Sequence, residues 1–174
     1  MRQLESWEEF VEIVKRHFSF LTGEFGYAMT SNAEPMIVYE SASLQVVVFS
    51  QFGARYGLDI RIEPLDTSPY GDFSLQTWRF ECLHRGNWAV ELPSDPPDDA
   101  DEIESFVREK ADQMNAHCSA VLRGDLEDVR RLQILEEEFK KRFTADYQRA
   151  NGSMGHAGMA NDLMNRIIKE QHWE

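Results

Sequence analysis

The sequence has few cysteines, a deficit of positive charge and no long hydrophobic run. Its 174 residues include two cysteines, Cys82 and Cys118, too few for a disulfide framework, and both are expected to be free thiols. No segment approaches the roughly 18 consecutive apolar residues that a membrane-spanning helix requires. The N-terminal segment MRQLESWEEFVEIVKRHF carries acidic residues where a secretory signal needs an apolar run. These absences predict a cytoplasmic protein.

The charge is strongly unbalanced. Lysine and arginine total 18 against 31 aspartates and glutamates, so the formal net charge is −13. Such a field repels phosphate backbones and anionic lipids, which argues against nucleic acid and membrane surfaces as partners. It favours a basic protein partner, because opposite net charge accelerates encounter. The alternative is that the acidic surface serves solubility alone.

Recognisable catalytic motifs are missing as well. The sequence contains no glycine-flanked nucleophilic serine, no His-Glu-x-x-His pair and no calcium-loop pattern. Gly152, Gly155 and Gly158 precede a predicted helix, yet their spacing is neither that of a dinucleotide-binding loop nor that of a P-loop. We therefore predict no catalytic residues and no cofactor site, and interpret these glycines as a hinge.

Four residues have side chains of the type that bind zinc: Cys82, His84, His117 and Cys118. Their spacing is poor for one site, because adjacent helical residues such as His117 and Cys118 point about 100° apart. Cys118 also falls on an apolar helical stripe. No metal site is predicted from them.

The chain should begin with a helix. Ser6-Trp7-Glu8-Glu9 fits a capping box, in which the Ser hydroxyl and the Glu carboxylate each bind a free backbone N–H. Gly23 is suited to end this helix. An apolar stripe at helical spacing connects the two ends, formed by Trp7, Phe10, Val11, Val14, Phe18 and Leu21.

A sheet is predicted next. Leu58, Ile60 and Ile62 alternate with polar residues, as in a strand with one buried face. Short connections favour antiparallel hairpins and hence a meander of four to five strands. The segment Ser74–Leu83 fits either a helix or a strand, with a short helix favoured. The other strands are predicted at Phe25–Thr30, Met36–Glu40, Leu44–Phe52 and Leu58–Ile62.

Helices packed on the sheet should complete an α+β fold. The Pro- and Asp-rich turn Ser94–Asp101 precedes a long helix, whose positive dipole end its acids complement. The tripeptide Arg123-Gly124-Asp125 resembles an adhesion signal, but Gly124 suits a helix C-terminus and Asp125 suits the N-cap of a following helix. We interpret the tripeptide as a joint between two helices.

The last residues differ from the body of the chain. Residues 1–150 are predicted to form one globular α+β domain, and residues 151–174 a glycine-containing linker, Asn151–Gly158, followed by an amphipathic helix. That short helix is marginal alone, so its apolar face requires cover from the body, from a second copy in a homodimer, or from a partner. The face consists of Leu163, Met164, Ile167 and Ile168.

Three short motifs carry a resemblance to known proteins. They are Phe18–Tyr27, Val38-Tyr39-Glu40-Ser41 and Leu122-Arg123-Gly124-Asp125. Together they resemble a loose group of small bacterial α+β proteins, some of which are similar to immunity proteins of toxin systems. The resemblance implies non-catalytic binding of a toxin.

The resulting hypothesis is a cytoplasmic protein that binds a protein partner, a basic toxin being one candidate. Its contact residues would come from an acidic group and from the apolar face of the last helix. The alternative is a small-ligand-binding protein or an enzyme with a pocket between the sheet and the helices. The candidate contact residues are Asp98, Asp99, Asp101, Glu102, Leu163, Met164, Ile167 and Ile168.

Overall fold

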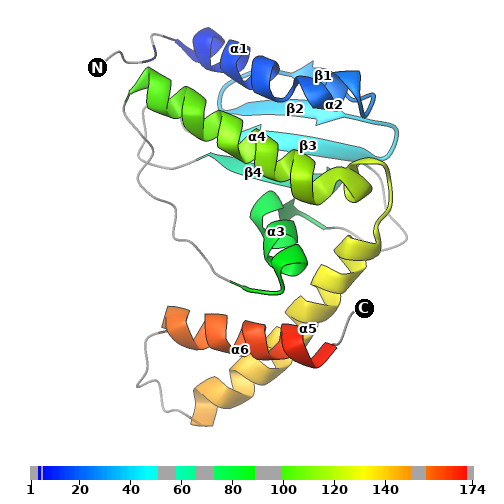
Figure 1. The fold of residues 1–174 in the computed structure, drawn as a ribbon, viewed down its shortest axis with the longest axis vertical. Coiled ribbons are helices and arrows are strands. Elements are labelled where there is room, and N and C mark those ends of the chain that lie inside the picture. The colour runs from blue at the N-terminus through cyan, green and yellow to red at the C-terminus, as the bar shows by residue number, and fades with distance from the viewer. Residues whose placement is uncertain are drawn as a thin grey trace.

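A five-stranded antiparallel sheet forms one layer of the protein, and helices lie across one of its faces (Figure 1). The computed structural model describes residues 4, 6–50, 58–65, 73–88, 99–149 and 156–171. The elements, in chain order, are α1 (Trp7–His17), α2 (Ser19–Gly23), β1 (Ala28–Ser31), β2 (Met36–Glu40), β3 (Leu44–Phe49), β4 (Asp59–Pro64), β5 (Leu75–Gln76), α3 (Thr77–Arg85), α4 (Ala100–Leu122), α5 (Glu127–Arg149) and α6 (His156–Gln171).

The strands lie in the sheet in the same order as in the chain, from β1 to β5. Every neighbouring pair is antiparallel, with Val38 of β2 opposite Val47 of β3 and Val47 opposite Arg61 of β4. The predicted α+β fold with an antiparallel meander is confirmed. Alternate residues face the helices and are buried, namely Ile37, Tyr39, Leu44, Val46, Val48, Ile60 and Ile62.

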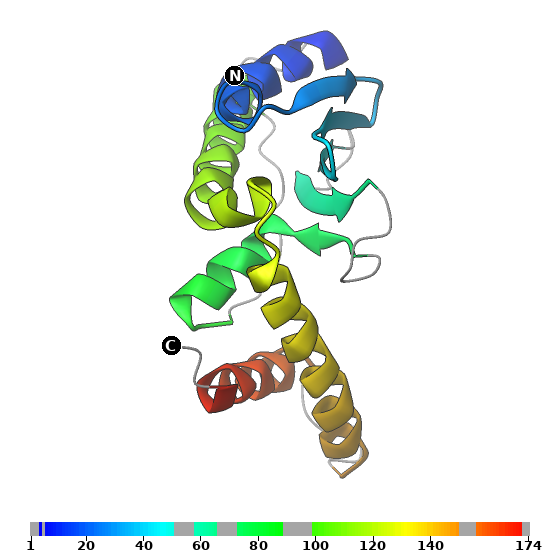
Figure 2. The ribbon, with the colours of Figure 1, turned by 90° about the vertical axis from the view of Figure 1, so that its right-hand side faces the viewer.

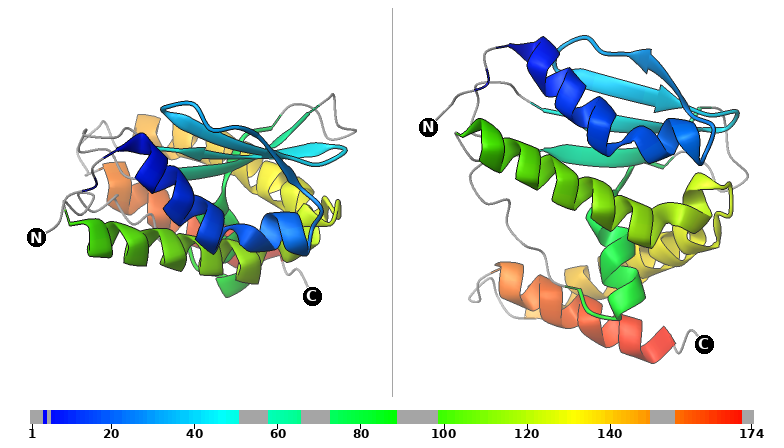
Figure 3. Two further views of the ribbon diagram at one scale, coloured as in Figure 1. Left: turned by 90° about the horizontal axis from the view of Figure 1, so that it is seen from above. Right: turned by 45° about the horizontal axis from the view of Figure 1, so that its top comes forward.

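The described helices form two groups, of which one lies on the sheet and the other lies beyond it. Figure 3 shows α1, α2 and α4 lying across one face of the sheet. The remaining helices, α3, α5 and α6, extend beyond the β4–β5 side, which gives the molecule its elongated outline in Figure 2. None of the helices in the described residues is long and apolar enough to cross a bilayer.

The strand boundaries differ from those predicted. β1 begins at Ala28 rather than Phe25, because Gly26 has a φ of 72° and directs the chain out of an extended conformation. β3 ends at Phe49 rather than Phe52, and residues 51–57 lie outside the described part of the chain. β4 runs from Asp59 to Pro64, two residues beyond its predicted end.

The first helix starts and stops as predicted but is interrupted. The hydroxyl of Ser6 accepts a hydrogen bond from the N–H of Glu9 at 3.3 Å, and α2 ends at Gly23. Between them, Phe18 has φ −94° and ψ 14°, which divides the predicted single helix into α1 and α2. Phe18 remains fully buried, so the break preserves its place in the apolar stripe.

The segment 74–83, for which the sequence allowed either a helix or a strand, contains a short strand followed by a helix. Leu75 and Gln76 form β5, and the chain turns directly into α3 at Thr77. The favoured helix is thus correct from Thr77 onward and wrong for Ser74, Leu75 and Gln76. Leu75 pairs with Ile62 of β4, so tertiary pairing determines the conformation that local pattern left open.

The joint between α4 and α5 has the predicted chemistry. Gly124 has a φ of 90°, a conformation that disfavours residues with a Cβ. The carboxylate of Asp125 accepts a hydrogen bond from the N–H of Glu127 at 3.1 Å, which caps the start of α5. Every residue of the adhesion-like tripeptide thus lies at a turn between two helices.

The last helix packs on its own chain. Leu163, Met164 and Ile167 are buried in the same core cluster as the sheet and the other helices. At the surface, Arg142 of α5 forms an ion pair with Glu170 of α6. α6 begins at His156, so the last three residues of the predicted linker are helical, while residues 150–155 lie outside the described part.

Candidate functional site

The predicted acidic group lies at the start of α4. Asp99 is the N-cap, and its carboxylate accepts a hydrogen bond from the N–H of Asp101 at 3.0 Å. Asp101 and Glu102 occupy the exposed first turn, where negative charge complements the helix dipole. Asp98 lies outside the described residues. The structure gives the three described acids a role in starting the helix.

The predicted apolar contact face on α6 is covered. Leu163 and Met164 are each 4% exposed and Ile167 is fully buried, while Ile168 is partly buried against the core. This face and the acids of α4 lie in different parts of the molecule (Figure 1). The structure therefore does not join the two groups into one surface.

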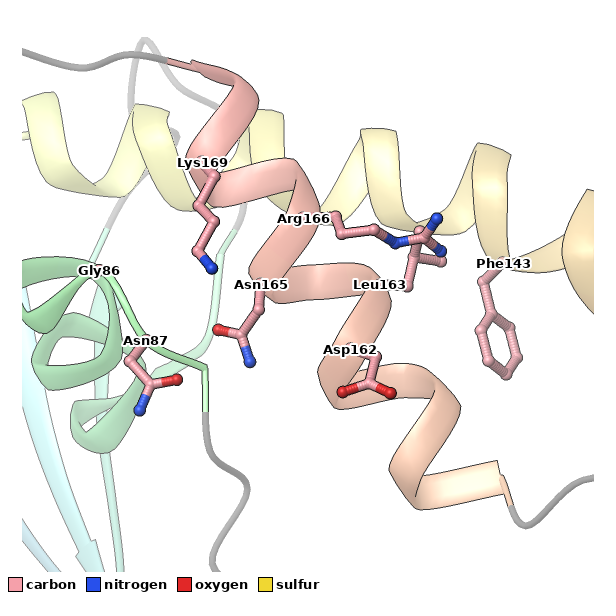
Figure 4. A pocket seen from close by; sticks show the side chains of 8 residues that line it. All are labelled: Gly86, Asn87, Phe143, Asp162, Leu163, Asn165, Arg166 and Lys169. Carbon is pink, nitrogen blue, oxygen red and sulfur yellow. The ribbon is translucent and has the colours of Figure 1, made fainter.

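A cavity of about 830 Å³ lies between the end of α3 and α6 (Figure 4). Asn165 does not project a free amide into it, because its Nδ2 donates to the Trp88 carbonyl at 3.0 Å and its Oδ1 accepts from the Trp88 N–H. Arg166 and Lys169 point in different directions in Figure 4. The full lining is Gly86, Asn87, Phe143, Asp162, Leu163, Asn165, Arg166 and Lys169.

This cavity differs from the pocket expected for an enzyme. It lies against α6 rather than between the sheet and the helices. The polar groups at its wall do not converge on one point, which a specific small-ligand site requires. It therefore gives the enzyme alternative no direct support.

The opposite face of the sheet presents hydrophobic side chains that sequence analysis did not single out. Met36, Val38, Val47 and Phe49, which we term the outer apolar strip, occupy adjacent positions on β2 and β3: Met36 pairs with Phe49, and Val38 with Val47. Met36 is 43% exposed and the others are half-buried. None of the four contributes to the core cluster of the described residues.

Charged residues flank this strip. Glu40 and Glu63 lie to one side, on either side of Gln45 in the paired strands. Glu63 accepts hydrogen bonds from Gln45 at 2.9 Å and Ser74 at 2.6 Å, neither of which carries a positive charge. On β4, Arg61 lies opposite Val47 and Asp59 lies opposite Phe49, and the two form an ion pair at 2.7 Å. The margin of the strip is thus net negative on its Glu40–Glu63 side.

A second group of polar side chains lies where α3, α4 and α5 meet. His84 of α3 and His117 of α4 approach within 3.4 Å through their Nδ1 atoms, and Nε2 of His84 lies 2.8 Å from Oδ2 of Asp128 on α5. Burial lowers the pKa of His117; nearby His84 and Arg85 lower it further, while Glu81 opposes them. His117 is therefore mostly uncharged at neutral pH.

The two cysteines are separated from this group by burial. Cys82 is 7% exposed and Cys118 fully buried, both lie within the core cluster, and neither forms a disulfide. Burial raises the pKa of the Cys118 thiol, which disfavours the thiolate that binds metals. Of the four zinc-type residues, the structure brings together the two histidines but not the cysteines with them.

The described residues contain no group of three or more His, Cys, Asp and Glu side chains placed to hold a metal ion. The surfaces left for functional interpretation are the outer apolar strip with its acidic margin and the histidine pair. No family model, no curated protein and no solved structure matches the chain.

Proposed function

We propose that the protein is a non-catalytic binding protein that contacts a basic protein partner through the outer face of its sheet. The observation that carries this proposal is the outer apolar strip: Met36, Val38, Val47 and Phe49 are neighbours, and α1, α2 and α4 lie across the other face of the sheet (Figure 3). Contiguous apolar surface of this kind is typical of an interaction site.

The charge of the molecule selects the partner's chemistry. Protein interfaces combine an apolar centre with a polar margin, and here Glu40 and Glu63 supply acids beside that centre. The net charge of −13 gives the molecule as a whole the same sign. A partner with an apolar patch ringed by lysine and arginine would satisfy both features and be attracted over long range.

Within this class, the best candidate partner is a basic toxin that the protein neutralises in the bacterial cytoplasm. The resemblance of the Phe18–Tyr27, Val38–Ser41 and Leu122–Asp125 motifs to immunity-like proteins supports this choice, and so does the negative charge. Neutralisation would require only that the bound protein covers the toxin's working surface.

The test uses basic proteins encoded beside this gene. Each is produced with and without this protein, and cell growth is measured. We expect one of them to arrest growth and co-production of this protein to restore it. The double variant Val47→Thr/Phe49→Thr keeps strand-forming residues but makes the strip polar, so rescue and calorimetric affinity should both fall. Ala116→Thr, exposed on α4, is the matched control.

The contribution of the acidic margin to binding is tested separately, by the rate of association. In Glu40→Gln/Glu63→Gln the association rate with the basic partner should fall, and its dependence on salt should weaken. The proposal is wrong if no basic neighbour binds, or if one binds equally well to the polar-strip variant. A dimer that dissociates on introducing Val47→Thr/Phe49→Thr, seen by sedimentation, would instead assign the face to a second copy.

A further inference from the structure

The geometry of the α3–α4–α5 junction points to a second site, and we propose that His84 and His117 together bind one divalent transition-metal ion of the zinc, nickel or copper class. The two Nδ1 atoms act as ligands, Asp128 orients His84 from outside the coordination sphere, and water completes the coordination. This proposal is independent of the outer apolar strip and does not rest on the proposed function.

The separation of the two nitrogens is the first argument. Hydrogen bonds donated by N–H groups usually span 2.7–3.2 Å, so the 3.4 Å between the Nδ1 atoms is long for one. Two nitrogens bound at about 2.0–2.1 Å to one tetrahedral zinc lie about 3.3–3.4 Å apart. The observed distance matches that between two ligands sharing a metal, and it lies at the long limit for a direct hydrogen bond.

The orientation of the rings agrees with this reading. Their centroids are 5.5 Å apart with an interplanar angle of 53°, so the rings are not stacked and meet through their nitrogens. Each histidine comes from a different helix, and α3 and α4 pack directly against each other. The pair is therefore held by the fold itself.

Asp128 supplies the second argument. Nε2 of His84 donates to the Asp128 carboxylate at 2.8 Å, which places the proton of a neutral imidazole on Nε2 and leaves a lone pair on Nδ1. A carboxylate behind a metal-bound histidine is the usual means of fixing its tautomer and increasing its basicity. The side chain of Asp128 is 13% exposed and that of His84 is 35% exposed, so the contact lies at the surface with its carboxylate end partly buried.

The surroundings set the type of ion and its affinity. Imidazole nitrogens suit zinc, nickel and copper, whereas calcium and magnesium prefer oxygen ligands. Glu81 and Arg85, near His117, pair with each other at 2.8 Å, and Arg131 lies 3.5 Å from the Asp128 carboxylate. With two protein ligands the ion should exchange readily, unlike one in a structural zinc site.

The test titrates zinc chloride, and separately nickel chloride, into full-length protein first stripped with a chelator. Calorimetry should report one ion per chain for the wild type. His84→Ala and His117→Ala should each weaken binding at least tenfold, and Asp128→Asn should weaken it about 10–100-fold. His17→Ala is the matched control, since His17 is a half-buried helical histidine 3.1 Å from the Glu104 carboxylate.

A spectroscopic readout covers the case in which a variant folds poorly. Electron paramagnetic resonance of the wild-type protein with one equivalent of copper should show two imidazole nitrogens on the ion. The proposal is overturned if neither zinc nor nickel binds, if fewer than two nitrogens are seen, or if folded His84→Ala/His117→Ala retains the wild-type affinity.

Discussion

At the scale of single residues, the phenol of Tyr39 stands out. This side chain is 1% exposed beneath the helices, and its hydroxyl has no hydrogen-bond partner among the described residues. Burial, with a smaller contribution from Glu12, raises the pKa of Tyr39 to about 12. A buried hydroxyl without a partner loses its hydration and gains nothing in return.

We predict that Tyr39→Phe stabilises the protein by about 1 kcal/mol, because the ring stays and the unpaired hydroxyl is removed. Tyr27 provides the control, since its hydroxyl donates to the Leu122 carbonyl at 3.4 Å. Urea unfolding should show Tyr27→Phe to be neutral or destabilising. Equal losses of stability in both variants would contradict the assignment of Tyr39 as unpaired.

Glu104 joins two helices by charge. Its carboxylate contacts His17, 3.1 Å away, and Arg16, both at the end of α1. The hydrogen bond from His17, followed by the contacts of Arg16, lowers the pKa of Glu104 below its ordinary value of 4.5. A lowered pKa means that the folded state binds fewer protons than the unfolded state, so this contribution to stability is present above pH 4.5 and lost on acidification.

Glu104→Gln should therefore lower the free energy of unfolding at pH 7 by less than about 1 kcal/mol, the usual value for an exposed ion pair. The difference from wild type should shrink as pH falls from 5 to 3, because wild-type Glu104 becomes protonated. Asp112→Asn, at an exposed position on the same helix, controls for the loss of a charge. A difference independent of pH would refute the interpretation.

At the scale of elements, the joint between α4 and α5 shows how a recognisable tripeptide can have an architectural explanation. Gly124 turns the chain and Asp125 caps α5. Arg123 extends over the ring of Phe25 at 5.0 Å and lies 3.9 Å from Glu24, with its side chain 61% exposed. Such exposed contacts contribute less than a helix cap.

Asp125→Ala should cost about 1 kcal/mol, while Arg123→Ala should cost no more than about half of that. Thermal unfolding of the two variants under the same conditions measures the difference. Two equal, negligible effects would remove the capping explanation and reopen an adhesive role for the tripeptide.

The docking of α6 gives a second test at this scale. Ile167 is fully buried against the core, whereas its neighbour Ile168 is partly buried. Ile167→Ala should lower stability by about 2–5 kcal/mol, and Ile168→Ala by clearly less. Chemical denaturation compares them. Small and equal losses would show that α6 does not depend on this packing in solution.

At the scale of the whole molecule, the sequence predicts the fold where signals are local. The Ser6 cap, the Gly124–Asp125 joint and the alternation around Ile60 each depend on residues a few positions apart. β5 could not be predicted from the sequence, because it is only two residues long and forms through pairing with β4. The order of elements thus followed from periodicity, while the short edge strand required tertiary context.

The candidate surfaces were much less accessible to prediction. Alternate residues of β2 and β3 are hydrophobic on both faces, so the pattern could not reveal that one face lacks cover from the described helices. The contact between His84 and His117 spans 33 positions and depends on how α3 crosses α4. Surface assembly of this kind is a product of packing, which a single sequence does not display.

The strand order has a consequence for synthesis on the ribosome. Because each strand pairs with the one made just before it, all the strands of the described residues have been synthesised once Gln76 has emerged. Arg16 and Glu104, which contact each other in the folded protein, are 88 positions apart. At about 5–20 residues per second, the ribosome therefore adds Glu104 about 4–18 s after Arg16. Until α4 follows, the helix-facing side of the nascent sheet and α1 offers the apolar surface that chaperones bind.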